Sequence, residues 1–287
     1  MTEARFYTPG DGGVQCLLCP HRCRIKEGAR GLCRSRECRD GKLWALSYGL
    51  PCAIAIDPVE KKPLNCFMPG THCLSLSCTG CNLSCRWCQN SDISQVRPED
   101  VDGSPVSPTE MVDLCVKRGL PSIAYTYTEP FTWFEYMYDI AILAHEKGLK
   151  NILVSAGYVS PEPLRELLPY LDAVNIDIKA MDDSFYRRYC GATLPPVLEN
   201  ILAMHAAGVH LEITNLLVTG LNDSEEQVAA LCRWMASNGL QDVPLHLSRY
   251  FPRYRMLSPA PTPKTTLLRA REVARSEGIH TVYLGNV

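Results

Sequence analysis

Short apolar runs alternate with amphipathic helical patterns over most of this 287-residue chain, from about residue 74 onward. Such alternation is typical of βα units, in which helices connect parallel strands. The strands are expected at 74–78, 122–127, 151–154, 173–178, 211–218, 243–247 and 281–283. The helices are expected at 109–118, 131–147, 162–168, 197–207, 224–238 and 264–277. Six or seven units predict an α/β fold with a full or partial βα barrel, whose chemistry lies at the carboxyl ends of the strands.

The composition is that of an ordinary globular protein, with 46% hydrophobic and 21% charged residues and a formal net charge of −2. This balance argues against a protein that coats nucleic acid or binds membranes through basic patches. No stretch reaches the roughly 18 apolar residues of a membrane helix, and residues 1–15 lack a signal-peptide core. We therefore expect a cytoplasmic protein, in which clustered cysteines serve as metal ligands rather than disulfides.

The 15 cysteines are concentrated toward the N-terminus, five between Cys16 and Cys38 and seven between Cys52 and Cys88. Charge is uneven as well. Residues 1–50 carry nine Lys or Arg and five Asp or Glu, a net +4, which leaves −6 for the rest of the chain. We expect a cysteine-rich, metal-binding N-terminal segment at 1–50 and an α/β body at 51–287.

Three cysteines follow the first expected strand with the spacing Cys81-x3-Cys85-x2-Cys88, and an aromatic residue, Trp87, precedes the last. Three thiolates on one tight loop can hold three corners of a [4Fe–4S] cluster, which ordinarily takes four cysteines. The fourth iron then keeps an open coordination position, as catalytic metal sites require. The loop therefore predicts an iron–sulfur cluster that binds a further ligand.

One neighbouring cysteine leaves an alternative open. Cys78 lies three residues before Cys81, so a fourth thiolate could close the cluster or create a zinc site. A cysteine that ends an apolar strand is more often a small buried hydrophobic residue, which is what we expect of Cys78. A closed cluster would instead make the chain a non-catalytic iron–sulfur electron carrier.

Polar and apolar residues alternate in the fourth expected strand. Because successive side chains of a strand point to opposite faces, Asn175, Asp177 and Lys179 are expected inside the barrel and the apolar residues between them under the helices. Three polar side chains on an inner face are costly unless they are paired or functional. Asp177 and Lys179 are therefore candidate site residues, with a structural ion pair as the alternative.

The cysteine loop resembles that of the radical S-adenosylmethionine (SAM) superfamily, and the chain is similar to its pyruvate formate-lyase-activating-enzyme branch. It also resembles, more closely, the radical SAM enzyme of the AmmeMemoRadiSam set, through residues 56–64, 88–95, 124–130 and 246–249. The resemblance implies a partial (β/α)6 barrel of the TIM type and a cluster whose open iron binds SAM. One electron, from a donor of the flavodoxin or ferredoxin type, then yields methionine and a 5′-deoxyadenosyl radical.

The resemblance also implies which residues contact SAM, most of them at strand ends. Glu129 matches a carboxylate that lies near the SAM amino group, and its alternative role is to complement the dipole of the following helix. The expected cofactor-binding residues are Trp87, Thr128, Glu129, Ser155, Asp177, Lys179, Thr214 and His246. Asp177, Lys179 and His246 are also expected to be catalytic, although a lone strand-end histidine can equally be structural.

A second group of cysteines has the spacing Cys16-x2-Cys19-x3-Cys23-x9-Cys33, with His21 as a further candidate ligand. Four soft ligands suit tetrahedral zinc or a fully ligated iron–sulfur cluster. A bound metal can also supply folding energy to a small segment. We favour structural zinc, with an auxiliary [4Fe–4S] cluster and unmetallated thiols as alternatives.

The sequence leaves the substrate open. The relatives suggest hydrogen abstraction from a partner protein, as in glycyl-radical activation, or action alongside Memo-like and AMMECR-like proteins. A zinc-dependent module that binds RNA through the basic N-terminal segment is a further alternative, but the weak overall charge argues against nucleic acid as a partner. No membrane partner is expected.

Overall fold

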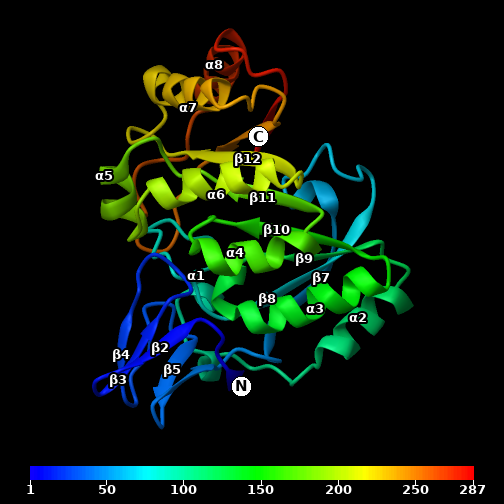
Figure 1. Cartoon of the computed structure of the whole chain (residues 1–287). Coiled ribbons are helices and arrows are strands. Elements are labelled where there is room, and N and C mark those ends of the chain that lie inside the picture. Colours follow the sequence, from blue (N-terminus) through cyan, green and yellow to red (C-terminus); the bar gives the residue numbers. More distant parts are fainter.

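The computed structural model describes residues 1–287, and an eight-stranded sheet forms its centre (Figure 1). Seven strands run parallel in chain order: β8 (His72–Cys78), β9 (Ser122–Tyr125), β10 (Lys150–Ser155), β11 (Ala173–Asp177), β12 (His210–Leu217), β13 (Leu245–Arg249) and β14 (Val282–Gly285). An edge strand that the sequence did not predict, β7 (Pro51–Pro58), pairs antiparallel with β8. Because β7 and β14 do not pair, the barrel is partial rather than closed.

Helices return the chain between the parallel strands. They are α2 (Pro108–Lys117), α3 (Phe134–Glu146), α4 (Pro161–Leu167), α6 (Pro195–Ala206), α7 (Glu225–Ser237) and α8 (Lys264–Ser276). Shorter turns are η1 (Val59–Lys61), α1 (Ser91–Ser94), η2 (Pro98–Asp100), η3 (Pro130–Trp133), η4 (Leu168–Tyr170), α5 (Asp183–Phe185) and η5 (Tyr186–Cys190), the last of π type. The expected alternation of strands and helices is confirmed. None of the helices combines the length and apolar character needed to cross a lipid bilayer.

The two faces of the sheet bury different residues. Val174, Ile176 and Ile178 join the large core beneath the helices, as the alternation in β11 predicted. On the inner face, toward the amino ends of the strands, a smaller apolar cluster fills the barrel with Val59, Leu64, Cys73, Ala124, Ile152 and Ala173. Apolar side chains therefore fill the inside of the barrel near the amino ends of the strands. The carboxyl ends remain available for a site.

The cysteine-rich N-terminal segment forms two small antiparallel sheets (blue in Figure 1). One contains β2 (Tyr7–Gly10), β3 (Gly13–Cys16) and β4 (Arg24–Lys26), and the other β1 (Thr2–Glu3), β6 (Lys42–Ala45) and β5 (Arg36–Arg39). The segment packs on α3, where the rings of Phe6 and Phe134 meet edge to face with centroids 5.0 Å apart. Residues 1–50 thus have their own sheets but share one hydrophobic core with the barrel.

Candidate functional site

A cavity of about 310 Å³ lies at the carboxyl ends of the parallel strands. Small-molecule sites in proteins are concave and typically occupy roughly 300–1,000 Å³. Cys81, Cys85 and Cys88 of the loop after β8 line this cavity. Seven of the eight residues expected to bind SAM line it as well: Trp87, Thr128, Glu129, Ser155, Asp177, Lys179 and Thr214. The structure therefore brings together side chains that come from separate strands.

Backbone hydrogen bonds hold the cysteine loop in place. The N–H groups of Ser84 and Arg86 donate to the carbonyls of Cys190 and Tyr189, at 2.7 and 3.0 Å. Gly191 ends η5 with φ of +67°, and a Cβ atom there would lie 2.4 Å from the Ser84 hydroxyl oxygen. Glycine is therefore required at position 191 both for its backbone conformation and for the close approach of the loop.

The structure places Cys78 away from the cavity. Its side chain is fully buried in the core beneath the helices, as expected of a small apolar residue, and burial raises the pKa of its thiol. The adjacent Ser77 hydroxyl lies 2.9 Å from the Thr128 hydroxyl. The thiols at the cavity are therefore three, and this donor set fits a [4Fe–4S] cluster with one iron left open.

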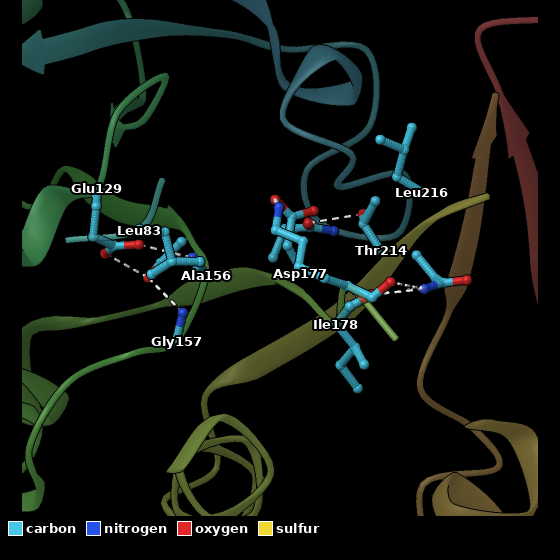
Figure 2. Close-up of polar contacts among 12 residues, drawn as sticks. Leu83, Glu129, Ala156, Gly157, Asp177, Ile178, Thr214 and Leu216 are labelled. Carbon is cyan, nitrogen blue, oxygen red and sulfur yellow. Dashed lines mark hydrogen bonds and ion pairs between the residues drawn. The ribbon is translucent and has the colours of Figure 1, made fainter. Parts of the chain in front are cut away.

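Glu129 connects the loop after β9 to the end of β10 in the cavity wall (Figure 2). Its carboxylate accepts hydrogen bonds from the Ser155 hydroxyl at 2.7 Å and the Ala156 N–H at 2.9 Å. It also accepts the Phe131 N–H at 3.4 Å, which caps the helical turn η3. Burial raises the pKa of Glu129 to about 7, because desolvation outweighs these hydrogen bonds.

Asp177 and Lys179 form an ion pair at the end of β11, with 2.7 Å between Nζ and Oδ2. The Lys179 side chain is 13% exposed. Burial alone would lower the pKa of Lys179, but the charges of Asp177 and of a Cys85 thiolate outweigh it and raise that pKa. On the neighbouring strand, the Thr214 hydroxyl donates to the Asn175 side chain at 2.8 Å (Figure 2). The site thus presents a fixed cation and anion side by side.

The expected position of His246 at a strand end is wrong. Strand β13 continues to Arg249, so His246 lies deeper in the barrel and does not line the cavity. Its Nε2 is 2.6 Å from the Glu212 carboxylate, and its ring stacks on Tyr283. Burial would raise the pKa of Glu212, but hydrogen bonds from two histidines and from the backbone at 65–66 hold it at about 2. His246 therefore belongs to a polar layer inside the barrel rather than to the cavity.

The cavity also contains side chains to which sequence reasoning gave no role. Lys61, Asn90 and Tyr127 line it. Asn90 donates to the Tyr127 carbonyl at 2.8 Å, and Asp57 accepts hydrogen bonds from Lys61 and Lys62, both at 2.7 Å. Residues 56–64 carried part of the family resemblance, so the sequence did indicate that this stretch matters. The resemblance alone did not show that the stretch reaches the cavity.

The N-terminal cysteines line a second hollow, which also includes His21. Cys16, Cys19, Cys23 and Cys33 all contribute to it, so the structure brings together the residues that the spacing singled out. No group of three or more His, Cys, Asp or Glu side chains is arranged to hold a single metal ion. The identity of a metal at this hollow stays a prediction, with structural zinc, an auxiliary [4Fe–4S] cluster and unmetallated thiols as the candidates.

Comparison with known proteins agrees with this geometry. The family model described as "Radical SAM superfamily" matches residues 76–235. An uncharacterised protein of Methanocaldococcus jannaschii is 43% identical over 100% of this chain and 86% of its own length. The 4-hydroxyphenylacetate decarboxylase activating enzyme of Clostridioides difficile is 22% identical over 58% of this chain and 73% of its own. The pyruvate formate-lyase-activating enzyme of Clostridium pasteurianum is 26% identical over 53% of this chain and 64% of its own.

Solved structures share the fold. A domain of pyruvate-formate lyase-activating enzyme from Bacteroides vulgatus superposes with a TM-score of 0.51 at 19% identity, covering 57% of this chain and 99% of that domain. A radical SAM methyltransferase from Sphaerobacter thermophilus gives 0.58 at 18% identity, covering 76% of this chain and 67% of its own. The match over more than half of the chain decides the family. This protein belongs to the radical SAM superfamily and is an enzyme of that class, which uses a [4Fe–4S] cluster and SAM.

Proposed function

We propose that this enzyme cleaves SAM reductively in the cavity at the carboxyl ends of the strands and abstracts a hydrogen atom from a partner protein. Cys81, Cys85 and Cys88 would hold the cluster. When bound, that cluster supplies the single electron that breaks the sulfonium bond of SAM, with a flavodoxin- or ferredoxin-type protein as donor. The observation that carries the proposal is that these three thiols share one cavity with seven expected SAM-binding residues.

The charged groups of the cavity suit the amino acid part of SAM. Lys179 and Asp177 lie 2.7 Å apart in a partly buried site. A carboxylate and an ammonium are bound most strongly by groups of opposite charge in such surroundings. Glu129 is committed to Ser155 and Ala156, so its contribution is to fix the shape of the wall at those two residues.

The loop that follows β13 is hydrogen-bonded to the cysteine loop. Gln89 donates to the Phe251 carbonyl at 3.2 Å, and the Arg255 N–H donates to the Arg86 carbonyl at 2.9 Å. These bonds fasten residues 250–256 over the cysteine loop. A carbon-centred radical needs enclosure, because enclosure prevents side reactions, and we propose that this loop contributes to it.

A shallow, open groove beside this loop is where we propose that a polypeptide substrate binds. It has a volume of about 660 Å³ and lies between α1 and residues 252–257. Leu257, which lines it, is 76% exposed. Two of the relatives are named for activating another enzyme, a decarboxylase and pyruvate formate-lyase. Activation of a partner enzyme by formation of a glycyl radical is the specific form that we propose.

Cleavage of SAM is the first test. Anaerobically reconstituted protein, reduced with dithionite, should release 5′-deoxyadenosine and methionine in equal amounts. Cys85→Ala should abolish the release, whereas Cys78→Ala should retain it. No release from wild-type protein that holds its iron would overturn the proposal.

The substrate class needs a separate test. A candidate partner enzyme carrying deuterated glycine should transfer deuterium to 5′-deoxyadenosine and acquire an organic radical signal. Leu257→Asp in the groove should weaken this transfer, while cleavage of SAM without a partner stays unchanged. Transfer that is equally fast in the groove variant would contradict the assignment of the groove.

A further inference from the structure

The N-terminal hollow is a ligand site without a described role. Its four cysteines come from the end of β3, the turn at 17–23 and the loop before β5. They are free thiols, and all but Cys23 are buried. The hollow contains only about 20 Å³ of space wide enough for a water molecule. Four thiols therefore face a space that is shielded from solvent.

The four cysteines line this space, but no three of them form a group that could hold a single metal ion. In a zinc site, bonds of about 2.3 Å draw four sulfurs around one ion, and no such group occurs in the structure. A Cβ atom at Gly31 would lie 3.2 Å from Ile25 Cδ1, 3.8 Å from the Cys33 sulfur and 3.9 Å from the Cys23 sulfur, so Gly31 lies directly beside two of the thiols. The thiols of Cys81, Cys85 and Cys88 likewise form no single-ion group, as expected of thiols that surround a cubane.

A buried cation faces the hollow with a free donor. Arg36 is 1% exposed and pairs with Glu135 at 2.6 Å. Its Nε lacks any hydrogen-bond acceptor, although Arg36 lines the hollow. A buried donor without a partner is destabilising. The sulfide or thiolate sulfur of a cluster would accept this hydrogen bond, and the guanidinium would offset part of the cluster's negative charge.

The N-terminal hollow lies against the cysteine loop of the SAM cavity. His21 Nε2 lies 2.7 Å from the Asn82 carbonyl oxygen. Asn82 lines the hollow and is adjacent in sequence to Cys81, which lines the cavity. A Cβ atom at Gly80 would lie 2.8 Å from the Cys33 carbonyl oxygen, so the two loops are in close contact.

We propose that Cys16, Cys19, Cys23 and Cys33 bind a second [4Fe–4S] cluster in which cysteine ligates every iron. Four thiolates are the usual complement of such a cluster. The proposal does not depend on SAM cleavage, because it rests on a separate set of ligands. Arg36 supplies the cluster with a hydrogen bond and a compensating charge.

Metal analysis of the full chain tests this proposal. A Cys81→Ala/Cys85→Ala/Cys88→Ala variant leaves the N-terminal segment untouched, so it removes only the first cluster. After anaerobic reconstitution it should retain about four irons and four acid-labile sulfides per chain, against about eight of each in wild type. One zinc without sulfide, or no metal at all, would overturn the proposal.

A matched pair of cysteine changes then locates the ligands. In the triple variant, adding Cys19→Ser should remove the remaining iron and sulfide. Adding Cys38→Ser should not, because Cys38 is buried in the same segment but does not line the hollow. Equal iron and sulfide in both variants would contradict the assignment. Iron that survives Cys19→Ser and is lost with Cys38→Ser would contradict it as well.

Discussion

The Glu129 carboxylate accepts a hydrogen bond from the Ser155 hydroxyl at 2.7 Å and so joins the loop after β9 to the end of β10. The sequence had offered two roles for Glu129, in the cofactor site or at the start of a helix. The structure combines them, since the same buried carboxylate lines the cavity and caps η3. Because these hydrogen bonds occupy its carboxylate, Glu129 can fix the positions of its neighbours in the cavity wall without offering a free carboxylate to a ligand.

Glu129→Gln should change how stability depends on pH. Folding raises the pKa of this carboxyl from 4.5 to about 7, so between these values the folded protein binds more protons than the unfolded chain. The contribution of Glu129 to the free energy of unfolding therefore falls as the pH rises from about 4.5 to 7, by about 3 kcal/mol in all.

Denaturant unfolding of wild type and Glu129→Gln at pH 5 and pH 8 checks this prediction. The difference in stability between the two proteins should shift in favour of the variant at pH 8. A difference that is the same at both pH values would show that Glu129 does not titrate in this range.

Lys179→Met should weaken SAM binding without loss of the cluster. The change removes the partner of Asp177 and the cation of the cavity, a charged hydrogen bond of about 1.5–3 kcal/mol, so affinity should fall roughly 10- to 100-fold. Lys150→Met is the matched control, because Lys150 pairs with Asp172 at the same distance of 2.7 Å outside the cavity. Equilibrium binding of SAM to iron-loaded protein measures both, and equal losses would contradict the assignment.

Gly191→Ala should displace the cysteine loop. Alanine at this left-handed position costs about 1–2 kcal/mol, and its Cβ would also clash with Ser84 beside Cys85. Gly208→Ala carries the same backbone strain, with φ of +75°, but meets no atom within 4 Å. Both variants should lose stability, whereas Gly191→Ala alone should bind less iron. Equal iron contents would show that the loop tolerates the clash.

Glu135→Leu should destabilise the contact between the N-terminal segment and α3. The change leaves Arg36 charged, buried and without its partner, which costs about 3–5 kcal/mol. Arg187→Ala breaks an exposed pair with Asp183 and should cost at most about 1 kcal/mol. Thermal unfolding compares the two, and a similar small loss in both would contradict a buried ion pair.

The barrel could be predicted from the sequence because the residue patterns that indicate its strands and helices are local. The apolar runs of β9 to β13 and the alternation around Asp177 follow from burial on two faces of each strand. The N-terminal sheets were not predicted, because their strands are two to four residues long. Such strands are too short to show the alternation of apolar and polar residues that indicates a strand. β7 was not predicted because it lies antiparallel at the edge of the sheet and is not part of a βα unit.

The candidate site was predictable where a residue ends a strand, as with Ser155 at the end of β10 and Asp177 at the end of β11. His246 was misplaced because its position depended on where β13 ends, and strand ends are set by pairing with neighbouring strands rather than by the residues alone. Lys61 was missed because it reaches the cavity from a turn before the first parallel strand. Such contacts depend on tertiary packing.

The central claim is that one iron of the cluster at the SAM cavity is free to bind SAM. Electron paramagnetic resonance of the reduced protein, mixed with SAM labelled with ¹⁵N at the amino group, tests it most directly. Hyperfine coupling of the label to the cluster is predicted in wild type and in Cys78→Ala. An intact, reduced cluster that shows no coupling to the label would contradict the account.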